Sequence, residues 1–227
     1  IDLGMGNPMD PAPNEVIEKL VEVAKDPKAH RYPESSGMPH LKNEIAKYYK
    51  RHYNIELNAE TQTYFTIGSK EGISHLCLAI MGPGDSVLVP APAFPVHIYA
   101  AVIAGATVMK IPIEPEKGFL DRIINICESC YPKPKVLMIN YPHNPTGVVT
   151  NKEFFKEVVK LAKRFKFMVI NDFAYSKITF DGYEAPSFLE VEGAKDVGVE
   201  FGSFSKSYNM AGWRIGYCVG NERIVQA

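Results

Sequence analysis

Residues 136–170 of this chain read VLMINYPHNPTGVVTNKEFFKEVVKLAKRFKFMVI. The runs at 136–139 and 167–170 are short and wholly apolar, which is typical of β-strands that are covered on both faces. Between them, residues 151–165 carry their apolar side chains at the spacing of a helix. This succession predicts two strands of a mostly parallel sheet with helices packed on each side of it.

The same alternation continues outward in both directions. Helical spacing recurs at 14–25, 39–53, 69–81, 96–104 and 120–130, and further short apolar strands are predicted at 87–89, 107–111 and 199–201. There is no internal repeat and no low-complexity segment. We therefore predict an α/β fold, a three-layer α/β/α arrangement around a mostly parallel sheet, while the length of 227 residues is compatible with one large domain or two small ones.

Composition and charge exclude several classes of protein. Apolar residues make up 46% of the chain, too many for a disordered one. Lys plus Arg number 25 and Asp plus Glu 26, so the net charge of −1 offers no electrostatic case for binding nucleic acid or an anionic membrane. The longest apolar stretch, 98–109, is too short to span a bilayer. With no secretory signal visible, we expect a cytoplasmic protein and no membrane partner.

Metal and nucleotide motifs are weak. Cys127 and Cys130 have a suggestive spacing, but no second ligand pair follows, so we expect reduced thiols and no metal. Gly4 and Gly6 lack a third glycine at the dinucleotide-binding offset, and no P-loop sequence is present. The chain begins with Ile1 and stops where a helix is starting, which suggests a piece of a longer protein.

The segment 203–216, SFSKSYNMAGWRIG, carries the strongest chemical signal. Lys206 lies between apolar runs, where the pKa of a lysine can fall far enough for it to act as a nucleophile or to form a Schiff base. The hydroxyls of Ser203 and Ser205 and the guanidinium of Arg214 would suit a phosphate. An amine of this kind beside a phosphate site points to pyridoxal 5′-phosphate.

That cofactor needs further parts, and each has a candidate. Asp172 follows the strand 167–170 and could pair with the pyridinium nitrogen. Tyr175 and Asn144 could donate to the phenolate oxygen, although the Asn-Pro-x-Gly sequence at 144–147 could equally be a plain turn.

Two more candidates concern the phosphate and the ring. Ser69 and Lys70 open the helix predicted at 69–81, which follows an apolar strand that ends near Thr66, and the free amides of this helix could face an anion. Phe94, held between prolines after a strand, could stack on the ring; an ordinary core position is the alternative.

Taken together, these segments resemble the large domain of the class I/II pyridoxal-phosphate-dependent aminotransferases of fold type I, the aspartate aminotransferase superfamily. The resemblance extends over all 227 residues, and the sequence is also similar to bacterial alanine (glutamate–pyruvate) aminotransferases. It implies that a C-terminal small domain is missing from this chain and that residues 1–15 border it. The arginine that holds the substrate α-carboxylate in this family belongs to that small domain and has no counterpart here.

The resemblance also implies a role for each candidate. Lys206 matches the lysine that bonds to the cofactor, Asp172 the pyridinium partner, and Tyr175 and Asn144 the phenolate donors. The phosphate positions are matched by Ser69, Lys70, Ser203, Ser205 and Arg214. Phe94 replaces a tyrosine or tryptophan at the stacking position, which preserves stacking and loses a hydrogen bond.

Three implications concern substrates and partners. Gly6 matches a backbone element of the substrate pocket, and Asn144 lies near the substrate carboxylate. Tyr32 matches a tyrosine that reaches the phosphate of the neighbouring subunit, which implies a homodimer with shared active sites. The expected substrates are an L-amino acid and a 2-oxo acid.

The implied function is therefore amino transfer, with alanine and glutamate and their oxo acids, pyruvate and 2-oxoglutarate, as the expected pairs. Several alternatives stay open: aspartate or LL-diaminopimelate aminotransferase, a carbon–sulfur β-lyase or decarboxylase on the same scaffold, and a cofactor-sensing domain of a transcription regulator. A regulator should carry a basic DNA-binding segment, and these 227 residues contain none.

Overall fold

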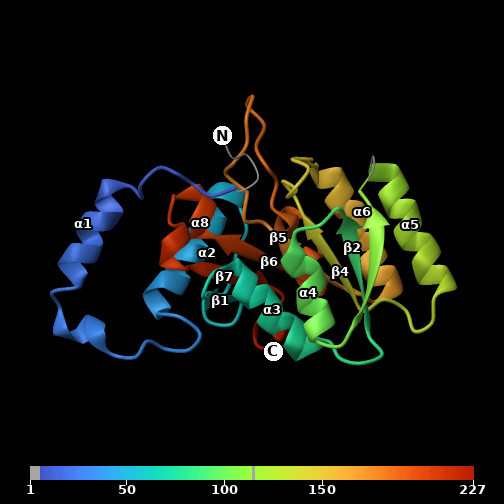
Figure 1. The fold of residues 1–227 in the computed structure, drawn as a ribbon, viewed down its shortest axis with the longest axis horizontal. Helices are drawn as coiled ribbons and strands as arrows, with labels where there is room; N and C mark the ends of the chain where they lie inside the picture. Colours follow the sequence, from blue (N-terminus) through green and yellow to red (C-terminus); the bar gives the residue numbers. More distant parts are fainter. Residues whose placement is uncertain (1–5, 114–115) are drawn as a thin grey trace.

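The structure is a computed structural model that describes residues 6–113 and 116–227 (Figure 1). Within these residues a seven-stranded sheet has the order β1-β7-β6-β5-β4-β2-β3. Its strands are β1 (Thr63–Thr66), β2 (Ser86–Ala91), β3 (Thr107–Pro112), β4 (Val136–Asn140), β5 (Met168–Asp172), β6 (Gly198–Ser203) and β7 (Gly216–Gly220). β7 is antiparallel to both of its neighbours, and the other pairs are parallel. The predicted α/β class and the mostly parallel sheet are confirmed.

The helices lie close to the predicted positions. The longer ones are α1 (Asn14–Val23), α2 (Pro39–Tyr53), α3 (Ser69–Ile80), α4 (Pro95–Ile103), α5 (Glu116–Ser129) and α6 (Lys152–Phe165). Short turns of helix are η1 (Pro27–His30), η2 (Phe188–Glu190), α7 (Ala194–Val197), α8 (Phe204–Ser207), η3 (Ala211–Trp213) and α9 (Glu222–Val225). α6 shows how the sequence sets such bounds: the Asn151 side chain accepts from the Phe154 amide at its start, and Lys166 adopts a left-handed conformation at its end.

Strand β4 shows why both faces of the sheet are covered. Its side chains alternate between two cores, since Leu137 and Ile139 belong to the core that also contains residues of α2, α5 and α6. Val136 and Met138 belong to the core that contains residues of α3 and α4. All four are fully buried, which confirms the reading of the apolar runs as doubly covered strands.

Strand β7 was not predicted, and its direction decides which loops meet. Because β7 runs antiparallel between β1 and β6, Thr66 and Ser203 both pair with Gly216. The carboxyl ends of β1, β6, β5, β4 and β2 therefore lie at one edge of the sheet, which is where open α/β sheets bind their ligands.

Helix α1 forms as predicted but lies apart from the sheet (Figure 1). Ile17, Leu20 and Val21 remain 39–52% exposed, and no residue of the helix is buried. The expectation that residues 1–15 border a small domain concerns in part residues 1–5, which lie outside the described residues. Of the helices in the described part of the chain, none has the length and apolar character needed to cross a membrane.

Candidate active site

A cavity of about 430 Å³ opens at the sheet edge defined above, a volume within the usual range of small-molecule sites. Ten of the twelve residues selected from the sequence line it, and they come from the ends of different elements. They are Ser69, Lys70, Phe94, Asn144, Asp172, Tyr175, Ser203, Ser205, Lys206 and Arg214. Ala174 and Ala211 complete the lining. The topology thus brings together segments that are more than 100 residues apart.

The other two candidates lie elsewhere. Gly6 is close to the cavity, because its carbonyl accepts a hydrogen bond from Lys206 Nζ and a Cβ at this position would lie 3.9 Å from the hydroxyl of Tyr175. Tyr32 does not line the cavity, and its side chain is fully exposed.

Lys206 lies on the short helix α8 and faces the cavity. Burial lowers the pKa of its amine, and the positive charges of Arg214 and Lys70 lower it further. Its Nζ is 6.0 Å from the centre of the Tyr175 ring. A lowered pKa increases the fraction of neutral amine, the form that can act as a nucleophile or base.

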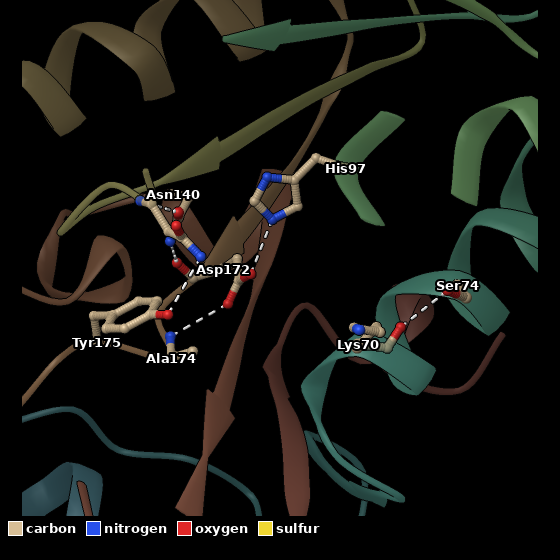
Figure 2. A network of polar contacts seen from close by, with 8 residues as sticks. Lys70, Ser74, His97, Asn140, Asp172, Ala174 and Tyr175 are labelled. Carbon is tan, nitrogen blue, oxygen red and sulfur yellow. Dashed lines mark hydrogen bonds and ion pairs between the residues drawn. The ribbon is translucent and has the colours of Figure 1, made fainter. Parts of the chain in front are cut away.

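Asp172 is the last residue of β5 and is only 5% exposed. Its Oδ2 lies 2.9 Å from Nε2 of His97, and its Oδ1 accepts from the amide of Ala174 at 3.2 Å (Figure 2). Two polar contacts hold the carboxylate in one orientation, as a buried charge requires.

His97, on α4, is a site residue that the sequence analysis missed. Its side chain is 1% exposed and contacts Asp172 directly. The available signal was a single imidazole in the otherwise apolar helix PVHIYAAVI, three residues after Phe94. A histidine in such a helix is usually read as core, and its partner is 75 residues away in the sequence.

Tyr175 and Asn144 contact each other across the cavity wall. Asn144 Nδ2 donates to the Tyr175 hydroxyl oxygen at 3.3 Å. Burial, and to a smaller extent the charge of Asp172, raises the pKa of the Tyr175 phenol. The phenol therefore keeps its proton at neutral pH and can donate a hydrogen bond into the cavity.

The opposite end of the cavity carries groups that can bind an anion. Helix α3 begins there with no side-chain cap, so its first amides stay available, and Ser69 and Lys70 stand on this first turn. Gly68 has φ +84°, and a Cβ on it would overlap the Arg214 guanidinium. Arg214 is held by a hydrogen bond from its Nη1 to the Ala211 carbonyl at 2.9 Å. Only glycine lets this arginine approach the helix start so closely.

Comparison with known proteins shows which family the chain belongs to. The sequence model of the family described as aminotransferase class I and II matches residues 1–227. This chain belongs to that family. The sequence resemblance to class I/II aminotransferases is thereby confirmed.

The chain is also similar to individual bacterial proteins. It is 48% identical over 227 residues to the glutamate–pyruvate aminotransferase AlaC of Escherichia coli, matching all of this chain and 55% of AlaC. It is 45% identical to an LL-diaminopimelate aminotransferase of Dehalococcoides mccartyi, of which it covers 58%. Its fold matches substrate-bound BacF of Bacillus subtilis with a TM-score of 0.92 and 39% identity, covering 100% of this chain and 57% of BacF. The chain thus spans somewhat more than half the length of these relatives.

Members of this family use pyridoxal phosphate. The donor set of the cavity suits that group in three respects. Asp172 offers a buried carboxylate for a protonated ring nitrogen, and Lys206 offers an amine with a lowered pKa. The start of α3 and Arg214 together form a positively charged site for a phosphate. Figure 2 shows Asp172 and Lys70 on separate elements, β5 and α3, so the acidic and cationic groups are kept apart.

Proposed function

We propose that the full-length protein to which this chain belongs is a pyridoxal-phosphate-dependent aminotransferase that moves an amino group between an L-amino acid and a 2-oxo acid. The observation that carries the proposal is the meeting of Lys206, Asp172 and Arg214 in one cavity of a class I/II aminotransferase chain. When bound, the cofactor supplies an aldehyde that an amine can join and a ring that accepts electrons. We also propose that residues 1–227 are its cofactor-binding large domain.

In this proposal most cavity residues bind the cofactor. Asp172, oriented by His97 and the Ala174 amide, pairs with the ring nitrogen. Tyr175 and Asn144 donate to the ring oxygen, and Phe94 covers a ring face. The phosphate is held by Ser69, Lys70, Ser203, Ser205 and Arg214 together with the first amides of α3.

Lys206 moves the proton. Its Nζ is the base that removes the proton from the substrate Cα, and the pKa lowered by burial, Arg214 and Lys70 favours the neutral amine that this step needs. Because Lys206 is fixed in the cavity lining, its amine would not have to diffuse to a bound substrate, and such proximity would supply much of the rate enhancement. The Gly6 carbonyl accepts a hydrogen bond from Nζ and so fixes the position of the amine.

The substrates proposed are alanine and glutamate with pyruvate and 2-oxoglutarate, supported by the 48% identity to AlaC. LL-diaminopimelate as amino donor is the second candidate, supported by several relatives of that activity at 41–45% identity. An amino-donor panel with 2-oxoglutarate as acceptor separates the two. Release of pyruvate and ammonia without an acceptor would instead indicate a β-lyase.

A homodimer with shared active sites is part of the proposal. In support, Tyr32 is fully exposed and so available to a neighbouring subunit's phosphate. Helices α3 and α4 pack together and leave large apolar side chains exposed at Leu78, Tyr99, Val102 and Ile103. A cytoplasmic location is proposed as well, supported by four cysteines that are all free.

The test is covalent trapping on the full-length protein. Borohydride reduction with bound pyridoxal phosphate, followed by peptide mass spectrometry, should place the label on Lys206. Lys206→Ala should lose both label and turnover, whereas Lys70→Ala, which changes the other lysine of the cavity, should keep the label on Lys206. A label on Lys70, or none on the parent protein, contradicts the proposal.

A further inference from the structure

Asn140, the last residue of β4, connects two of the groups assigned above to the cofactor. Its side chain is 1% exposed. Its Nδ2 donates to the backbone carbonyl of Asp172 at 2.6 Å, and its Oδ1 accepts from the backbone amide of Asn144 at 2.8 Å. Building on the proposed aminotransferase function, we infer that Asn140 is a positioning residue that sets the spacing between the ring-nitrogen acid and the ring-oxygen donor.

The first contact follows from the sheet register. Asn140 and Asp172 are direct partners on the parallel strands β4 and β5, and both strands end at this pair. The Asn140 carboxamide therefore joins the two strands where the backbone ladder stops. Without it, the carbonyl of Asp172 loses a buried hydrogen-bond partner at the residue whose carboxylate must keep its place.

The second contact controls the loop after β4. Asn144 is held by its backbone amide, which leaves its side chain free to donate to Tyr175. Tyr175 in turn follows Asp172 by three residues. Three hydrogen bonds and the chain segment 172–175 therefore form a closed loop through Asn140, Asp172, Tyr175 and Asn144. Figure 2 shows Asn140, Asp172 and Tyr175 together.

An asparagine is needed for this double contact. A carboxamide is one rigid planar unit that donates from nitrogen and accepts at oxygen, so it fixes two backbone groups relative to each other. Leucine has a similar volume and makes neither contact, and serine is too short to make both.

The neighbouring strand provides a matched control in Asn171. This asparagine is also fully buried and directly precedes Asp172, but its Nδ2 donates to Glu200 Oε2 at 2.9 Å in the protein core. It does not line the cavity. Asn171→Leu thus removes a buried carboxamide of the same kind, one residue from Asp172, without touching the loop that carries Asn144.

The experiment uses the full-length holoprotein and three readouts: the dissociation constant for pyridoxal phosphate, the pH midpoint of the absorption change of the bound cofactor, and kcat. We expect Asn140→Leu to shift the pH midpoint by about one unit, the size expected for one lost hydrogen bond. We also expect kcat to fall about 100-fold, as for a misplaced reacting group. Asn171→Leu should lower the melting temperature while leaving the pH midpoint unchanged.

The outcomes separate this inference from the proposed function. A parent protein that binds no pyridoxal phosphate refutes both. If the parent binds the cofactor, two results would refute only the role of Asn140. One is a pH midpoint of Asn140→Leu equal to that of the parent, and the other is an equal shift of the midpoint in Asn171→Leu. If Asn140→Leu does not fold, Asn140→Ser gives the same comparison, since a small polar side chain leaves room for water.

Discussion

Nε2 of His97 lies 2.9 Å from Oδ2 of Asp172, and the two side chains are 1% and 7% exposed. One residue lies in helix α4 and the other ends strand β5, so the contact joins two elements of different layers. With the Ala174 amide on Oδ1, it gives the carboxylate a donor on each oxygen (Figure 2). The acid is thus oriented before any cofactor arrives, which is the condition for strong electrostatic pairing in a buried site.

Removing this imidazole should weaken cofactor binding. We expect His97→Phe to raise the dissociation constant for pyridoxal phosphate about 10- to 100-fold, because a hydrogen bond to a buried charged group is lost. His97→Asn, which keeps a donor, should recover part of the loss. His75→Phe is the control, since His75 pairs with Glu71 on the exposed surface of α3. Equal effects of the His97 and His75 substitutions in an equilibrium titration would contradict the assignment.

Gly68→Ala should impair the anion end of the cavity. A Cβ at this position would displace the Arg214 guanidinium, and the residue also has φ +84°. Gly84 is the matched control, with φ +92° and open space around it, so Gly84→Ala carries only the backbone strain of about 1–2 kcal/mol.

The measurement for this pair is the ratio of the affinities for pyridoxal phosphate and pyridoxal. The ratio reports the phosphate contribution and should fall only for Gly68→Ala. The prediction fails if both alanine variants keep the ratio of the parent protein.

His143 should make the fold less stable in acid. Burial lowers the pKa of this imidazole to about 4, so it stays neutral in the folded protein. Between pH 6.5 and about 4 the unfolded chain therefore binds a proton that the folded chain does not. The free energy of unfolding should fall by about 3 kcal/mol as the pH drops through this window. Urea unfolding of the parent and of His143→Asn at several pH values isolates the effect, because the variant lacks it.

Glu200 should give a pH dependence of the opposite sign. Its carboxyl is fully buried and accepts from Tyr49, Ser187, Asn171 and the Phe188 amide at 2.8–2.9 Å, yet burial raises its pKa to about 7. Below its unfolded pKa the group is protonated in both states. As the pH rises from about 4.5 through 7, the unfolded chain ionises more readily, so this contribution to stability is lost.

The variant for this test is Glu200→Gln, which does not ionise. The free energy of unfolding of the parent minus that of the variant should decrease from pH 5 to pH 8 by about 2–3 kcal/mol. Chemical denaturation at both pH values provides the measurement, and a difference that stays constant with pH would count against the raised pKa.

The sequence predicted most elements but not all of the sheet. β4, β5 and β6 contain short runs that are mostly apolar, and α2 and α6 have clear helical spacing, so local pattern was enough. β7 is the short segment GYCVG, which begins and ends with glycine and has no comparable apolar run. Its antiparallel place between β1 and β6 depends on both neighbours, and no local pattern contains that information.

The candidate site divides in the same way. Lys206, Asp172 and Arg214 were selected because each lies in a local motif and has the side-chain chemistry that the cofactor needs. His97 and Asn140 were not selected, because their importance comes from contacts with Asp172 across 75 and 32 positions of sequence.

The sequence by itself determined the fold class, the family and the chemical inventory of the cavity. It could do so because side-chain periodicity and residue type are local properties. Only the tertiary structure decided that Thr66 and Ser203 meet at Gly216, that His97 and Asn140 hold Asp172, and that the α1 apolar face is left uncovered by the described residues. Those relationships depend on which strands pair and which faces pack, and these choices are set by burial summed over the whole domain.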